Sequence, residues 1–150
     1  MISPTGSTPS DLFERDQVAW LDAMVALIRR GAVQELDFAR LEEFLSDLAI
    51  RARREVDGQL VGLLTHTLKW THLPRYRSPS WKETIIQQRH ELARLVSRGV
   101  LHNHAESALQ AAFAEAVERT VLDTSMPAET FVNDCPKTLV ELMRFDYASE

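Results

Sequence analysis

The most informative stretch of the sequence is residues 66–89, which read HTLKWTHLPRYRSPSWKETIIQQR. On both sides of its two prolines, apolar residues follow the three-to-four spacing of an amphipathic helix. Pro74 and Pro79 bound a short turn, because proline breaks helical hydrogen bonding and disfavours helix in the residue before it. Two of the three tryptophans, Trp70 and Trp81, flank this turn together with several cations. The stretch therefore predicts two helices joined by a proline-bounded turn, with Trp81 buried against the first of them.

The helical periodicity extends over almost the whole chain. The expected helices run from Ser10 to a stop at Gly31, from Asp37 to His72 as one helix or as two with a break near residues 50–58, from a Ser80–Glu83 capping box to Gly99, from about Asn103 to Val121, and from Cys135-Pro136 to Met143. No run of alternating β-branched residues predicts a strand. We therefore predict an all-α, single-domain bundle of five to six helices over residues 11–147, preceded by a disordered lead-in over residues 1–10.

Composition limits the class of protein. The chain has 150 residues, of which 45% are apolar and 26% charged, as in one globular domain with a single core. It contains neither an apolar run of the roughly 20 residues that span a bilayer nor a secretory signal. One cysteine, Cys135, excludes an internal disulfide and is typical of a reducing cytoplasm. We expect a cytoplasmic protein without a membrane span.

Charge is distributed unevenly along the chain. Residues 1–50 carry four cations and nine anions (−5), residues 51–98 ten and four (+6), and residues 99–150 three and nine (−6). Either the basic helices dock on acidic ones inside the fold, or the segment 69–98 binds a polyanion. The first explanation is preferred. Nucleic acid is an unlikely partner, because the whole chain is acidic and has no helix-turn-helix or RNA-binding signature.

A narrow strip of unusual residues lies on one face of the helix over residues 56–72. On a helical wheel this strip contains Gly58, Gly62, His66 and Lys69, with Trp70 at its edge. Two glycines four residues apart allow another backbone to approach, or leave a shallow groove beside a histidine and a lysine. The preferred interpretation is tight helix packing or a dimer contact, and a homodimer is expected.

Gln88 and Arg89 fall on the apolar face of the following helix. A buried guanidinium needs a carboxylate or several carbonyls, since an unpaired buried charge costs several kcal/mol. The structural interpretation is an ion pair with Glu43 or Asp37, or a side chain that reaches the surface. The functional one is an anion-binding arginine supported by Arg77, Lys82 and Lys69. The structural interpretation is preferred.

No pattern of established chemistry is present. The five histidines do not form His-Glu-x-x-His, Cys-x-x-Cys is missing, and neither a phosphate loop nor a nucleophile elbow occurs. We predict no metal and no cofactor, and no catalytic residue can be assigned. The candidate functional surface comprises His66, Lys69, Trp70, Arg77, Trp81, Gln88 and Arg89.

These residues resemble a bacterial family known only as domain of unknown function 29. The resemblance runs from about Phe13 to Met143 and is carried by Asp16, Trp20, Arg30-Gly31, Leu36-Asp37, Leu41, His66-x-Leu68-Lys69-Trp70, Arg77, Ser80-Trp81-x-x-Thr84-Ile85-x-x-Gln88-Arg89, Asp123-Thr124, Pro127, Phe131 and Cys135-Pro136. The chain departs from the family pattern at residues 40–45, at Leu73, and at Lys137. The resemblance implies an all-helical bacterial cytoplasmic protein and carries over no catalytic residue.

Three functions are ranked on this basis. The first is a non-enzymatic interaction or scaffold module, so activity as an enzyme is the less favoured reading. The second is polyanion binding through residues 69–98. The third is an enzyme for an anionic small molecule near His66, Lys69 and Arg89.

Overall fold

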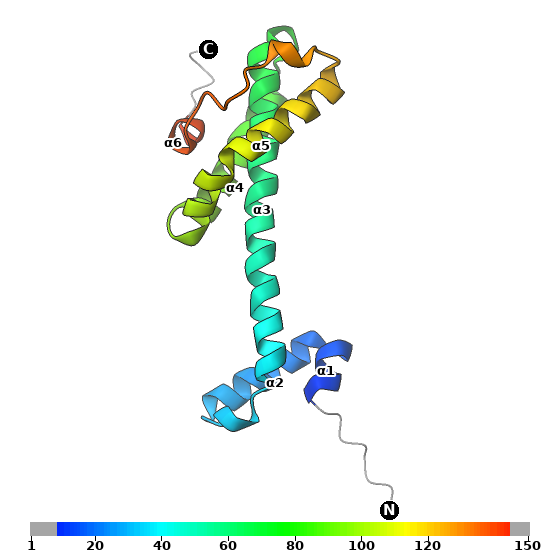
Figure 1. The fold of residues 1–150 in the computed structure, drawn as a ribbon, viewed down its shortest axis with the longest axis vertical. Helices are drawn as coiled ribbons and strands as arrows, with labels where there is room; N and C mark the ends of the chain where they lie inside the picture. Colours follow the sequence, from blue (N-terminus) through cyan, green and yellow to red (C-terminus); the bar gives the residue numbers. More distant parts are fainter. Residues whose placement is uncertain (1–8, 145–150) are drawn as a thin grey trace, which may run out of the picture. The chain divides into compact units, whose positions relative to one another are not determined.

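The computed structural model describes residues 9–144, and over that range it contains six α-helices and no strand (Figure 1). The helices are α1 (Pro9–Arg15), α2 (Gln17–Arg29), α3 (Phe38–His72), α4 (Pro79–Val96), α5 (Val100–Thr124) and α6 (Leu139–Met143). Short 3-10 turns lie at Val33–Glu35, Pro74–Tyr76 and Ala128–Thr130. The predicted all-α fold of five to six helices is confirmed. Of the predicted lead-in, residues 9 and 10 begin α1, and residues 1–8 lie outside the described part.

The chain divides into two compact units, one up to residue 50 and the other from residue 51 onward. Unit 1 comprises α1, α2 and the first turns of α3, and unit 2 comprises the rest of α3 with α4, α5 and α6. The extent of the predicted domain, residues 11–147, stays a prediction.

Unit 1 has a very small core. Only Trp20 and Met24 are buried among its described side chains. The Phe13 ring meets Trp20 edge-on with centroids 4.8 Å apart, and Phe44 of α3 lies 6.1 Å from the same indole. Arg40 then holds α3 to α1, because its guanidinium lies 5.1 Å from the Phe13 ring centroid and 3.1 Å from Glu14 Oε1.

One predicted boundary in unit 1 is wrong. The sequence suggested a single helix from Ser10 to Arg30, but α1 ends at Arg15 and α2 begins at Gln17. Asp16 causes the break, since its carboxylate accepts a hydrogen bond from Ala19 N at 3.0 Å and so caps α2. The stop at Gly31 is confirmed, because this residue has a φ of +71° after the end of α2.

Helix α3 settles the alternative that the sequence left open. It is one uninterrupted helix of 35 residues. Asp37 starts it by accepting a hydrogen bond from Arg40 N at 3.2 Å, and Pro74 follows its end.

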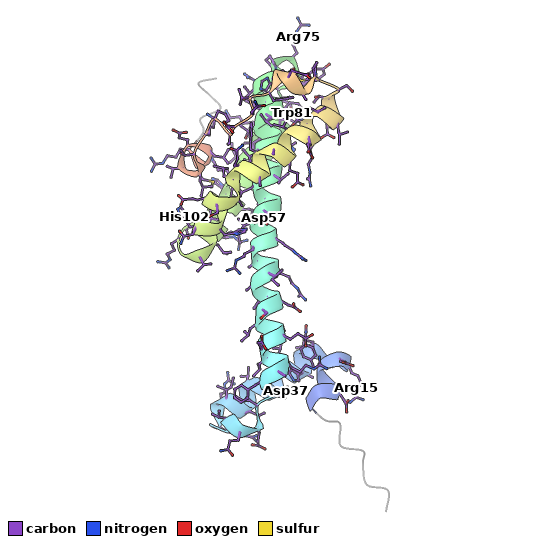
Figure 2. All side chains as sticks on the ribbon, in the orientation of Figure 1. Arg15, Asp37, Asp57, Arg75, Trp81 and His102 are labelled. Atoms are coloured by element: carbon purple, nitrogen blue, oxygen red, sulfur yellow. The ribbon has the colours of Figure 1, made fainter. Side chains whose placement is uncertain are left out.

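Unit 2 contains most of the buried apolar side chains. Its core is formed by Val56, Leu60, Leu63 and Leu64 of α3, Ile85, Leu92 and Val96 of α4, Ala105, Ala112, Phe113 and Ala116 of α5, and Leu139 and Leu142 of α6, among others. The buried alanines of α5 allow its backbone to approach its neighbours closely. His104 of α5 and Asp57 of α3 are joined at 2.6 Å; Figure 2 labels Asp57 on α3.

Two further predicted helix starts are wrong. Helix α4 is capped by Ser78, whose hydroxyl accepts from Trp81 N at 3.1 Å, and not by the Ser80–Glu83 box. Pro79 then occupies the first helical turn, where its missing N–H is no loss. The last helix begins at Leu139 after a Thr138–Glu141 capping box, so Cys135-Pro136 lie in the preceding loop. Within residues 9–144 no helix is both long and apolar enough to cross a membrane.

Candidate functional site

Arg77 is used to build the turn between α3 and α4. Its Nε donates to the Trp70 carbonyl at 2.8 Å, and its guanidinium lies 5.0 Å from the centroid of the Trp70 ring. The hydrogen bond satisfies one of the carbonyls that a helix end leaves without an intrahelical partner. Arg77 and Trp70 therefore act together as a clamp on the turn. Arg75, two residues earlier, points outward from it (Figure 2).

Lys69 reaches across to α5. Its Nζ donates to Asp123 Oδ2 at 2.7 Å, and Lys69 is the less exposed partner of this pair. The hydrogen bond and charge of Lys69 lower the pKa of Asp123, and the charges of Arg119 and His66 contribute in the same direction. In this pair, a lysine of the basic middle segment contacts an acid of the acidic segment 99–150. The charge pattern suggested internal pairing of this kind.

A groove of about 370 Å³ lies beside this ion pair. Its walls are Lys69, Leu73, Tyr76, Trp81, Asp123 and Thr124. Trp81 packs against the core and is partly buried, and its burial against α3 stays a prediction. It lies in the first turn of α4, where it borders the groove. Figure 2 labels Trp81 at this end of unit 2.

The glycine strip on α3 packs inside the chain at one position. A Cβ placed on Gly62 would lie 3.0 Å from Gln88 Nε2, so the missing side chain makes room for Gln88 of α4. The buried Gln88 Oε1 accepts no hydrogen bond within the described structure. His66 lies on the same side of α3, with Nδ1 2.9 Å from the Gly62 carbonyl. Gly58, in contrast, has nothing near its missing Cβ.

Arg89 is half-buried on α4, as its place on the apolar face suggested. The two acids named as its partners have other roles, because Asp37 caps α3 and Glu43 lies 3.0 Å from Arg40. The structure places six of the seven candidate residues in three pairs, and their role as one functional surface stays a prediction. Lys69 and Trp81 share the groove, Arg77 and Trp70 form the clamp, and His66 and Gln88 both lie at Gly62.

Four groove residues were missed as site residues by sequence reasoning. They are Leu73, Tyr76, Asp123 and Thr124. Asp123-Thr124 were among the residues that carry the family resemblance, which was the available signal. Lys69 and Asp123 are 54 residues apart in the sequence, so the helical periodicity of a single segment could not predict their contact.

A second cavity, of about 270 Å³, has mostly apolar walls that include Leu64, Leu68, Phe113 and Leu142. Cys135 borders it, half-buried, with a pKa raised by burial that a backbone hydrogen bond at Lys137 partly offsets. Gln110 fixes this loop, since its Oε1 accepts from Cys135 N at 2.9 Å and its Nε2 donates to Asn133 O at 3.2 Å. A thiol with a raised pKa is a poor nucleophile at neutral pH. Among the described residues, no three metal-ligating side chains come together.

Unit 1 exposes a large amount of apolar surface. The exposed large apolar side chains between residues 11 and 50 are Val18, Val25, Ile28, Val33, Phe38, Leu45, Leu48 and Ile50. On α3, every residue from 45 to 51 is exposed. Exposed apolar side chains mark an interaction surface where they form a contiguous patch, whereas singly scattered ones are ordinary.

Over residues 9–144, the helices, the clamped turn and the groove define an all-helical protein. The chain belongs to the family described as Domain of unknown function DUF29, which matches residues 12–148. Comparison with curated proteins and with solved structures gave no match.

Proposed function

We propose that the chain is a non-enzymatic interaction module that binds a protein partner along the first half of α3. The observation that carries the proposal is the exposed segment 45–51. Leu45 is 58% exposed, Leu48 52% and Ile50 45%. Helices in proteins gain most of their stability from packing an apolar face, and a helix alone in water is marginal. A partner that covers this face supplies the missing packing.

The energetics agree with a docking surface. Complete burial of one large apolar side chain is worth about 1.5–3 kcal/mol, so covering the exposed half of the four such side chains on the first half of α3 contributes about 3–6 kcal/mol. Association itself costs about 4–15 kcal/mol in lost translational and rotational freedom. A smooth polar partner would therefore bind weakly, whereas a partner with an apolar stripe of its own would roughly double the favourable contribution.

The alternative functions receive less support from unit 2. An enzyme for an anionic substrate would use Lys69 and His66, but Lys69 is paired with Asp123 and His66 lies against the Gly62 carbonyl. Polyanion binding would use Arg77, whose Nε is bonded to Trp70. The cytoplasmic location expected from the single cysteine stays a prediction.

Site-specific photo-crosslinking tests the proposal. A photoreactive phenylalanine analogue replaces Leu48 in one variant and Leu122 in a control. Leu122 is matched to it as a leucine exposed on a helix, at 81%, but lies in unit 2. Irradiation of cells that naturally contain the protein should give a protein adduct from position 48 and none from position 122. Adducts of equal yield at both positions, or none at position 48, would refute the docking surface.

A further inference from the structure

The first half of α3 carries apolar residues at the spacing of a coiled coil. Phe38, Leu41, Leu45, Leu48 and Ala52 follow one another at intervals of three, four, three and four residues. We call these five residues the α3 stripe. This is the heptad pattern in which alternate a and d positions face a partner helix. No charged or polar residue interrupts it, and Phe38, Leu45 and Leu48 are exposed in the structure.

We propose that the α3 stripe binds the same stripe of a second copy of this chain, with the two helices antiparallel. The proposal rests on the proposed function, because it names the partner that covers the exposed segment. The occupant must bring an apolar stripe of similar length and spacing, and another α3 stripe meets this requirement without any further assumption.

Charge along α3 favours the antiparallel arrangement. From residue 37 to 47 the chain carries Asp37, Glu42, Glu43 and Asp47 against the single cation Arg40, which gives −3. From residue 51 to 55 it carries Arg51, Arg53 and Arg54 against Glu55, which gives +2. Antiparallel helices place the acidic part of one stripe beside the basic part of the other, whereas parallel helices place like charges together.

The residues at the heptad positions also favour the antiparallel arrangement. When Leu41 packs opposite Leu45 of the second copy, and Phe38 opposite its Leu48, the flanking positions bring Asp37 near Arg51 of the second copy. In this register the dimer has two attractive pairs, each between Asp37 of one copy and Arg51 of the other. It has one repulsive pair, between the two Glu42 residues.

The overlap is short, and this sets the expected affinity. The stripe covers residues 38–52, which at about 1.5 Å per residue is roughly 20 Å of helix. Two-stranded contacts of this length are weaker than those of long coiled coils, so we expect a reversible monomer–dimer equilibrium. Dissociation constants in the micromolar range are typical of such modest interfaces.

Sedimentation equilibrium of the full chain tests the proposal. The unmodified chain should shift from monomer to dimer as its concentration rises. The double variant Leu45→Lys and Leu48→Lys should weaken association by about a hundredfold or more, since each dimer loses four apolar contacts. Leu122→Lys, the matched control, should associate like the unmodified chain. A chain that stays monomeric at all concentrations overturns the proposal.

Charge reversal provides a second test, which does not depend on whether the chain with Leu45→Lys and Leu48→Lys folds. Arg51→Glu with Arg54→Glu changes the net charge of residues 51–55 to −2, and Glu42→Lys with Asp47→Lys changes that of residues 37–47 to +1; all four side chains are exposed. The first variant alone should associate at least about tenfold more weakly than the unmodified chain, because both Asp37–Arg51 attractions of the dimer become repulsions. An equimolar mixture should recover association as a heterodimer. A mixture that stays monomeric while the unmodified chain dimerises overturns the proposed contact.

The two proposals fail differently. If the adduct at position 48 contains only a different protein, and the chain alone is monomeric, the docking surface stands and the second copy is excluded. If position 48 gives no adduct, both proposals fail. If the adduct joins two copies of this chain, both are supported.

Discussion

Gly62 and Gly58 lie on the same face of α3, but only Gly62 has a neighbour. Alanine stabilises an exposed helix relative to glycine, so we expect Gly58→Ala to raise the free energy of unfolding by about 0.5–1 kcal/mol. Gly62→Ala should give a smaller gain or a loss, because the new methyl group comes 3.0 Å from Gln88 Nε2. Chemical denaturation measures both. Equal gains at the two glycines would show that Gln88 does not constrain the helix.

Asp123 and Lys69 predict a pH effect of definite sign. Because Lys69 lowers the pKa of Asp123 in the folded chain, the pair stabilises the fold above the ordinary Asp pKa of 3.8. This contribution is lost as the pH falls through the lower folded value. Thermal unfolding of the unmodified chain and of Asp123→Asn should therefore differ at neutral pH and converge in acid below 3.8. A difference that persists or grows in acid would contradict the pairing.

At the scale of the elements, the start of α4 distinguishes two serines. Ser78 caps the helix through its hydroxyl, so Ser78→Ala should cost about 1 kcal/mol of stability. Ser80 lies within the helix and is exposed, and Ser80→Ala should cost little. Denaturation curves for the two variants decide which serine caps α4. A larger loss at Ser80 would restore the capping box that the sequence suggested.

The helices were predictable from periodicity, and their ends were less so. The apolar spacing and the prolines identified α3, α4 and the turn between them. The sequence suggested Ser80 as the cap of α4, whereas in the structure Ser78 caps the helix and Pro79 lies in its first turn. Likewise, Asp16 lies inside a continuous helical pattern, and its capping bond to Ala19 N divides that pattern into α1 and α2. A side chain that caps a helix breaks the helical pattern without changing the spacing of the apolar residues. Apolar periodicity therefore does not predict such a break.

The candidate site was predictable only in part. Lys69, Trp81 and the turn were identified, because a tryptophan pair with nearby cations is visible in sequence. Their partners were not, since Asp123 meets Lys69 through the packing of α5 against α3. Arg77 looked like a ligand-binding cation, yet the Trp70 carbonyl and ring account for its place. The apolar face over residues 38–52 was visible in sequence, but its exposure required the structure.

For the molecule as a whole, we predict that the first half of α3 is covered by protein in the cell. Cysteine labelling measures this directly. Cys135→Ser removes the native thiol, and a cysteine is then introduced at Leu48 or, as the control, at Leu122. We predict that a maleimide labels position 48 more slowly in the cell than in the dilute purified chain, whereas position 122 is labelled equally fast in both. Equal labelling of position 48 in the cell and in dilute solution would show that protein does not cover the first half of α3 in the cell.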